Sequence, residues 1–229
     1  MKKLFLLSIL FCAFTASAQK ARRLEILFLG DNGHHRPIER VPAIMSALGD
    51  KGVNFTYTDK LEDINSVNLN KYDAVMIYAN WDSIPPSVEK DLLAYVASGK
   101  GILPIHCASY CFRNSSEYVT LVGGQFWRHT LDTVETQAVQ PEHAIMHGLK
   151  SFRAYDETYL HTKLQEDNNI LAVREIKADQ FKDKPNTKTE PYTWTRSYGK
   201  GRVFYTAYGH DENTWQNRSE ERRVGKECA

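Results

Sequence analysis

Three short and almost uninterrupted apolar runs constrain the fold of this chain more than any other feature. They occupy residues 24–29, 73–78 and 101–105. Such runs are typical of parallel strands, because both faces of a parallel sheet are usually covered. Two segments with helical features, Val41–Leu48 and Pro85–Ser98, lie between the runs. This alternation predicts a doubly wound α/β sandwich with a mostly parallel central sheet.

The second half of the chain has a different pattern, in which strand-like segments follow one another without long helices. The last two are joined around Gly199-Lys200-Gly201, which predicts a hairpin. The stretch from Asp179 to Glu190 is rich in lysine, aspartate, threonine and proline, so we expect a solvated loop there. Outside the three apolar runs, the expected strands are residues 53–58, 134–139, 169–174, 192–198 and 202–207.

Residues 1–18 have the features of a secretory signal. Lys2 and Lys3 precede an apolar stretch at residues 4–14, and Ala16-Ser17-Ala18 forms a small-residue cleavage site. The apolar stretch is too short to span a bilayer. We therefore expect residues 1–18 to be removed and the protein to be exported, periplasmic or secreted, with no integral membrane segment.

Residues 19–217 predict one domain, which is long enough to bury a full core. Residues 218–229 differ from it, because they are dense in charge and Val224 is their only large apolar side chain. The last helix of an α/β domain needs an apolar stripe. We expect this tail to be non-native or the result of truncation, and the final helix of the fold to be missing.

Charge and cysteine content exclude several classes of function. A formal net charge of +1 provides no concentrated basic surface for nucleic acid or an anionic membrane. Of the four cysteines, only Cys107 and Cys111 lie well inside the expected domain, which is too few for a disulfide scaffold. Residues four apart on a helix have poor geometry for a bridge. We expect two free, buried thiols.

Several of the eight histidines follow the ends of separate predicted strands. The carboxyl ends of parallel strands meet at one edge of a sheet, so these imidazoles are expected to line one cleft. We expect His106, at a sharp turn, to lie at a helix N-terminus, where the dipole disfavours the imidazolium. A neutral imidazole there can act as a base or polarise a carbonyl. The converging histidines are His34, His35, His106, His129 and His210.

A pair of acidic residues and a set of aromatic rings complete the candidate chemistry. Asp156-Glu157, followed by Tyr159, offers a general acid, a base or an acceptor for sugar hydroxyls, with a solvated acidic turn as the alternative. Flat rings beside carboxylates suit the apolar face of a sugar, although tryptophan is commoner in a core. The rings near predicted loops are Trp81, Phe126, Trp127, Tyr159, Trp194 and Trp215.

His143 and His147 are four residues apart, a spacing that places two imidazoles on one face of a helix. No glutamate follows His143 as a zinc protease would require, and Pro141 and Gly148 leave barely two turns. We expect this segment to pack as a loop, with a metal-binding pair as the alternative.

Short segments spread over residues 24–215 form a recognisable series. They are Gly30 with His34-His35, Gly99 to Ser109, Leu121 to Phe126 with His129, His143 to Leu149, Asp156 to Tyr159, Tyr198 to Tyr205, and Gly209 to Asp211. In this order and spacing they resemble the ThuA-like (trehalose utilisation) family of the class I glutamine amidotransferase-like superfamily. The resemblance implies a flavodoxin-like three-layer sandwich. It also implies a role in carbohydrate metabolism, on trehalose-like or keto-disaccharides or related glycosides.

The chain departs from an amidotransferase at the nucleophile. His106 stands where such an enzyme carries its cysteine, and Cys107 comes one residue later. His210-x-Glu212 resembles the amidotransferase His-x-Glu pair, which implies the frame of a triad without its nucleophile. Glutamine hydrolysis is therefore not expected.

Three hypotheses for function follow. The first is a sugar-processing enzyme that uses His/Glu acid–base chemistry and neither a metal nor another cofactor. The second is a non-catalytic carbohydrate-binding or interaction domain on a degenerate amidotransferase fold, and the third is a hydrolase whose histidines hold zinc or another divalent ion. For the first, the expected catalytic residues are His106, Glu157, His210 and His129, and the expected substrate-binding residues are His34, His35, Asp31, Trp127, Tyr159 and Asp211.

Overall fold

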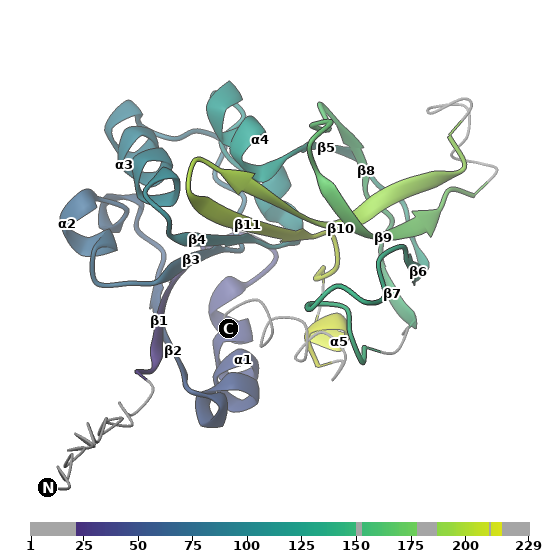
Figure 1. The fold of residues 1–229 in the computed structure, drawn as a ribbon, viewed down its shortest axis with the longest axis horizontal. Coiled ribbons are helices and arrows are strands. Elements are labelled where there is room, and N and C mark those ends of the chain that lie inside the picture. Colours follow the sequence, from purple (N-terminus) through teal and green to yellow (C-terminus); the bar gives the residue numbers. More distant parts are fainter. Residues whose placement is uncertain (1–21, 150–152, 178–186, 211, 217–229) are drawn as a thin grey trace, which may run out of the picture.

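The computed structural model describes residues 22–149, 153–177, 187–210 and 212–216 (Figure 1). The expected signal peptide, the expected tail at residues 218–229 and most of the expected loop before Glu190 lie outside these ranges. None of the described helices has the length and apolar character needed to cross a membrane.

Parallel strands form one half of a nine-stranded sheet, in the order β2-β1-β3-β4-β11. This corresponds to the 2-1-3-4-5 order of one common doubly wound sheet. All four residues of β3 are buried, as expected for a strand covered on both faces. The expected α/β class and the parallel core of the sheet are thus confirmed. The strands are β1 (Leu24–Leu29), β2 (Val53–Thr58), β3 (Ala74–Ile77), β4 (Gly101–Pro104) and β11 (Gly201–Thr206).

Antiparallel strands extend the sheet beyond β11, in the order β10-β9-β6-β7. The expected hairpin is confirmed, with Tyr198 of β10 opposite Gly201 of β11. The expected loop is wrong at its end, because β10 begins at Thr189 and Glu190 is fully buried. A separate pair, β5 and β8, lies beside the sheet. These strands are β5 (Gln125–Arg128), β6 (Leu131–Ala138), β7 (Arg153–Glu157), β8 (Leu160–Thr162), β9 (Asn169–Glu175) and β10 (Thr189–Tyr198).

Helices cover both faces of the parallel half (Figure 1). Alternate residues of β1 point to opposite faces, so Ile26 and Phe28 join the core beneath α1, while Leu27 and Leu29 join the core beneath α3. The α-helices are α1 (Val41–Leu48), α2 (Ser66–Leu69), α3 (Pro86–Ala97), α4 (Ser116–Val122) and α5 (Glu212–Trp215). Short 3-10 turns are η1 (Pro37–Arg40), η2 (Gly49–Lys51), η3 (Leu61–Asp63) and η4 (His106–Ser109).

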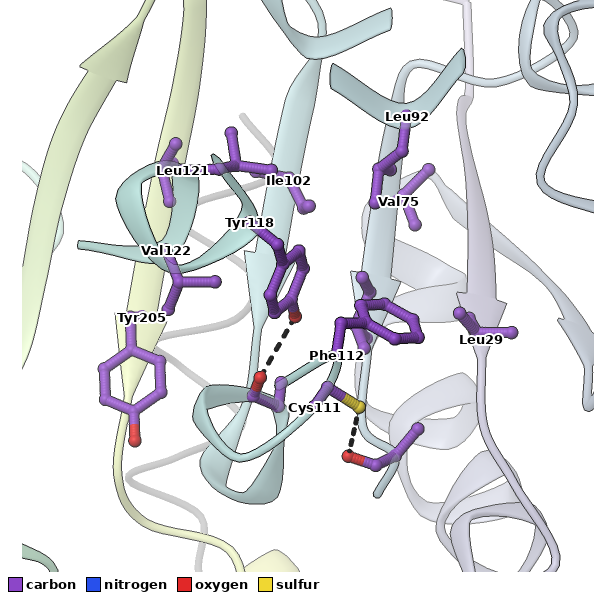
Figure 2. Packing of buried hydrophobic residues seen from close by; sticks show 14 of the residues in the cluster. Leu29, Val75, Leu92, Ile102, Cys111, Phe112, Tyr118, Leu121, Val122 and Tyr205 are labelled. Carbon is purple, nitrogen blue, oxygen red and sulfur yellow. Dashed lines mark hydrogen bonds between the residues drawn. The ribbon is translucent and has the colours of Figure 1, made fainter. Parts of the chain in front are cut away.

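Figure 2 shows the core between the sheet and the α3/α4 layer, where strand, helix and loop side chains interlock. The hydroxyl of Tyr118 donates to the carbonyl of Ala108 at 3.0 Å. The thiol of Cys111 donates to the carbonyl of Ala79 at 2.8 Å. Cys107 and Cys111 are both free and fully buried, which confirms the expectation for these thiols, and burial raises the pKa of each.

Gly201→Ala is expected to destabilise the protein by about 1–3 kcal/mol, because the added methyl overpacks the contact between β11 and α3. A Cβ at this position would lie 2.0 Å from the carbonyl oxygen of Val96, a backbone atom that cannot rotate away. Urea denaturation measures the effect. Gly49 provides the control: its φ is −54° and no atom lies within 4 Å of an added Cβ, so alanine there fits. Equal midpoints for the two variants would contradict the steric argument.

Candidate functional site

The carboxyl ends of β1 and β3 open into a cavity of about 680 Å³, a volume typical of small-molecule sites. In a doubly wound sheet this edge, where the strand order reverses between β1 and β3, is the usual place for a ligand. The antiparallel half contributes Glu157 at the end of β7 and Tyr159 just after it to the wall of the cavity. Polar groups on its wall include Asp31, His35, Asn80, Asp82, His129 and Glu157.

Aromatic rings form the apolar part of the same wall. They are Trp81, Tyr110, Phe126 and Tyr159. The Trp81 ring is fixed because its Nε1–H donates to the carbonyl of Gly30 at 3.0 Å. The cavity thus presents flat rings beside carboxylates and imidazoles.

Trp127 was expected to bind substrate, but the structure places it off the cavity wall. Side chains alternate along a strand, so Phe126 of β5 faces the cavity while its neighbour Trp127 faces away. Trp127 is 44% exposed, and the Arg128 guanidinium lies 4.5 Å from its ring centroid. Two other rings noted in the sequence also lie elsewhere: Trp194 is fully buried in the core, and Trp215 packs against Tyr78.

Glu157, the last residue of β7, is the centre of the polar cluster. One carboxylate oxygen lies 3.2 Å from His106 Nε2, and the other lies 3.1 Å from His210 Nδ1 and 3.3 Å from His129 Nε2. Burial alone would raise the pKa of Glu157, but His106 and His210 together hold that pKa well below its ordinary value. The carboxylate therefore stays charged, with imidazole nitrogens on several sides.

The neighbouring carboxylate, Asp156, is used up in hydrogen bonds within the protein. It is fully buried and accepts from the backbone N–H groups of Glu157, Gly209 and His210 at 2.7–3.1 Å. It also accepts from the hydroxyl of Thr214 at 3.0 Å. Asp156 therefore fixes the loop that carries His210, whereas Glu157 faces the cavity. Both are ordered strand residues, so the alternative of a solvated acidic turn is wrong.

His106 occupies the sharp turn after β4 but is not itself on the cavity wall. Its side chain is fully buried, behind Tyr159, whose ring stacks on it at 4.3 Å. Its backbone has φ 49°, a left-handed conformation that histidine adopts more readily than most residues. The expected helix start is confirmed only in part, because the helix that begins at His106 is the four-residue 3-10 turn η4, and the α-helix α4 starts at Ser116.

One hydrogen bond of His106 locates a proton on its ring. Nδ1 lies 2.7 Å from the carbonyl oxygen of Ala207, which can only accept, so Nδ1 carries a proton. The other ring nitrogen, Nε2, lies 3.2 Å from the Glu157 carboxylate and 3.2 Å from the hydroxyl of Tyr159. Burial raises the pKa of Tyr159, so its hydroxyl stays protonated.

The two histidines after β1 have different environments. Both line the cavity, as expected. His34 is exposed, whereas His35 is only 4% exposed and contacts the rings of His34, His106 and His210 at 4.0–5.5 Å between centroids. Burial first, and then the neighbouring imidazoles, lower the pKa of His35 to about 2. Its neutral ring has no hydrogen-bond partner on either nitrogen among the described residues.

Asp31 lines the cavity, but its carboxylate is already engaged. One oxygen accepts from the N–H of Gly33 at 2.7 Å and the other from the N–H of Asn80, so Asp31 joins the loops after β1 and β3. The side-chain oxygen of Asn80 is buried with no partner in the described structure, which leaves it free for a ligand. Asn80, Tyr110 and Asp82 were missed from the sequence, although Asn80 follows an apolar run as the histidines do.

The resemblance to an amidotransferase triad does not extend to the geometry. His210 lies against Glu157, while Glu212 is exposed and accepts from the side chain of Gln216 at 2.6 Å. Cys107 is fully buried away from the cavity wall. Asp211, an expected substrate-binding residue, lies outside the described residues.

A second buried polar network, also missed from the sequence, lies behind the first. Glu190 accepts from the backbone N–H of His161 at 2.7 Å and lies 3.0 Å from its Nδ1. His161 Nε2 is 3.0 Å from the hydroxyl of Tyr205, which is 2.9 Å from that of Ser109. Tyr205 also donates to the carbonyl of His106, so this network supports the turn that carries His106.

Among the described residues, one group has the composition of a metal site. His35, His106, Glu157 and His210 each offer one donor atom, and these atoms lie within 4.8 Å of one another. The pair His143 and His147 lies instead in a turn segment, whose Ile145 and Met146 pack with β9, so the expected loop packing is observed.

Several solved bacterial structures have a similar fold. A ThuA-like protein from Bacteroides uniformis ATCC 8492 gives a TM-score of 0.75 at 18% identity, covering 93% of each chain. Another from Parabacteroides merdae ATCC 43184 gives 0.70 at 18% identity, covering 91% of this chain and 90% of that one. The β-galactosidase of Rahnella sp. R3 gives 0.60 at 16% identity, but its match covers 88% of this chain and 30% of that enzyme.

At these identities the structural likeness establishes the fold and leaves the activity open. A comparison with curated proteins found no match. The family model described as trehalose utilisation (ThuA) matches residues 25–224, which is most of the chain. This protein therefore belongs to the ThuA family, which is linked to trehalose utilisation.

Proposed function

We propose that this protein is an exported enzyme of carbohydrate metabolism that acts on trehalose-like or keto-disaccharides or glycosides by His/Glu acid–base chemistry. The observation that carries the proposal is the Glu157 carboxylate, which lies on the cavity wall within 3.3 Å of three imidazoles. The signal-like features of residues 1–18 support export. The β2-β1-β3-β4-β11 order supports the flavodoxin-like frame of the amidotransferase-like superfamily.

His129 and Glu157 are the groups best placed to touch a substrate. Both line the cavity, and the His129 side chain is 36% exposed, so it can exchange protons with solvent. In a 3-keto sugar the ketone acidifies the C2–H. A base that removes this proton allows the electron pair to expel the glycosidic oxygen from C1, and an acid protonates that oxygen as the C1–O bond breaks. His106 and His210 act as positioning residues, because they hold Glu157 without lining the cavity.

His129→Ala is expected to lower turnover by about 100-fold, the lower end of the range for a general acid or base. The full chain would be incubated with trehalose, 3-keto-trehalose and related keto-glycosides, and products followed by chromatography. His147→Ala is the matched control, since that histidine is exposed and lies off the cavity wall. Turnover unaffected by His129→Ala would reject the assigned role, and no product from any of these sugars would reject the enzyme.

A non-catalytic carbohydrate-binding domain is the second candidate. The observation in its favour is that the Rahnella β-galactosidase contains this fold as only 30% of a larger sugar-cleaving chain. Calorimetry and chromatography on the same sample separate the two candidates. Saturable binding of a disaccharide that is never converted would support the binding domain.

A further inference from the structure

We propose that His35, His106, His210 and Glu157 form a binding site for a divalent transition-metal ion, with zinc as the best-matched member of the class. The site lies at the inner wall of the cavity, where three imidazoles and one carboxylate converge from the ends of four different strands, β1, β4, β7 and β11. The proposal deepens the proposed function at the same site, but its test needs no sugar.

The spacing of the donor atoms matches a single ion. All four lie within 4.8 Å of one another. The Glu157 carboxylate lies 3.2 Å from His106 Nε2 and 3.1 Å from His210 Nδ1. Neighbouring ligands around tetrahedral zinc, at bond lengths of about 2.0–2.1 Å, are roughly 3.3 Å apart. Side-chain rotations that close the wider separations, which reach up to 4.8 Å, would place all four donors around one centre.

His106 is oriented as a metal ligand usually is. Its Nδ1–H donates to the carbonyl oxygen of Ala207 at 2.7 Å. A bond of this kind fixes the tautomer and ring direction of metal-ligating histidines and leaves the lone pair of the other nitrogen for the ion. That other nitrogen, Nε2, lies 3.2 Å from the Glu157 carboxylate, and an ion bound there would take the place of the Nε2 proton.

His35 provides an independent observation. It is 4% exposed, and neither ring nitrogen has a hydrogen-bond partner among the described residues. Burying a polar group without a partner is costly, so native structures rarely leave one unexplained. Its ring lies nearly perpendicular to those of His106 and His210, at 76° and 89°. A cation between these rings would satisfy the imidazole that the protein leaves unpaired.

The donor set selects the class of ion. Imidazoles favour zinc and its transition-metal neighbours, whereas magnesium and calcium prefer oxygen ligands. His35 and Glu157 line the cavity, so an ion held by them is reachable from solvent and can accept a ligand from the cavity side. If the proposed function holds, such an ion would polarise a sugar oxygen, while His129 remains free for proton transfer.

The test is zinc binding by the full chain after treatment with a chelator and dialysis. Calorimetric titration with zinc chloride is expected to show about one ion per chain, and zinc is expected to raise the thermal midpoint. His35→Ala and His210→Ala are each expected to weaken binding by at least about 10-fold. His35→Ala should leave the metal-free midpoint unchanged or higher, because the imidazole it removes has no partner. The matched control is His147→Ala, which removes an exposed histidine that lies off the cavity wall and should bind zinc as the parent does.

Three results would overturn the proposal: no saturable zinc binding, unchanged affinity in both ligand variants, or binding lost only on replacing His143 and His147. A structural role for His35 would instead lower the metal-free midpoint and leave zinc affinity intact, which also overturns it. Zinc binding without sugar turnover would support the metal site and count against the proposed enzyme activity. Sugar turnover by a chain that binds no zinc would support the enzyme activity and overturn the metal site.

Discussion

Glu190→Leu is expected to lower the free energy of unfolding by about 3–5 kcal/mol, because it removes one partner of a fully buried polar pair. Glu190 and His161 have completely buried side chains. The carboxylate accepts from the backbone N–H of His161 at 2.7 Å and lies 3.0 Å from its Nδ1. Leucine has similar volume but no acceptor, so both nitrogens lose a partner that water cannot replace. Urea denaturation followed by circular dichroism measures the change.

Glu135→Leu is the matched control, on a strand of the same sheet. Glu135 pairs with Arg153 at 3.6 Å across β6 and β7, but both side chains are more than half exposed. Exposed pairs of this kind contribute about 0–1 kcal/mol. Equal losses in the two variants would show that the buried pair contributes no more than a surface pair. Glu190→Gln, which keeps an acceptor oxygen, should fall between them.

Trp194→Ala is expected to cost about 3–5 kcal/mol, the usual range for removing a large aromatic side chain from a core. Trp194 is fully buried, and its Nε1–H donates to the carbonyl of Val122 at 2.8 Å. Its ring packs against Tyr205 at 4.2 Å and closely approaches Gly124. Alanine would leave a large cavity and an unpaired carbonyl at the end of α4. The thermal midpoint and the urea midpoint should both fall.

Trp127→Ala gives the control with the same chemical change. Trp127 is 44% exposed and contacts mainly the Arg128 guanidinium. Surface substitutions usually change stability by about 0.5 kcal/mol or less. Because Trp127 lies off the cavity wall, this variant should also process any substrate as the parent does. A large loss of activity in Trp127→Ala would restore the role that the sequence led us to expect.

The local sequence pattern was enough to locate the parallel half of the fold. A strand buried on both faces must be almost wholly apolar, so the runs that became β1, β3 and β4 stand out without any knowledge of their partners. The segments β5, β7 and β8 were missed, since each is three to five residues long and carries polar side chains. Their strand character depends on pairing with distant residues.

The candidate site was partly predictable for a topological reason. Parallel strands end at one edge, so the expected meeting of His35, His106, His129 and His210 near Glu157 is observed. Which of these imidazoles faces the cavity was not predictable. His106, the foremost residue in the sequence, is buried behind the wall, whereas His129 faces the cavity.

Taken alone, the amino-acid sequence determined the class of fold and the edge of the sheet at which polar side chains gather. Buried strands require apolar residues and the turns after them carry glycine and polar residues, so both can be recognised from short stretches of sequence. Which of two adjacent acids faces the cavity was decided only in three dimensions. Asp156 and Glu157 are chemically alike, and the pleat of β7 turns one toward the Gly209 loop and the other toward the imidazoles. The unpaired ring of His35 is likewise visible only once the chain is folded around it.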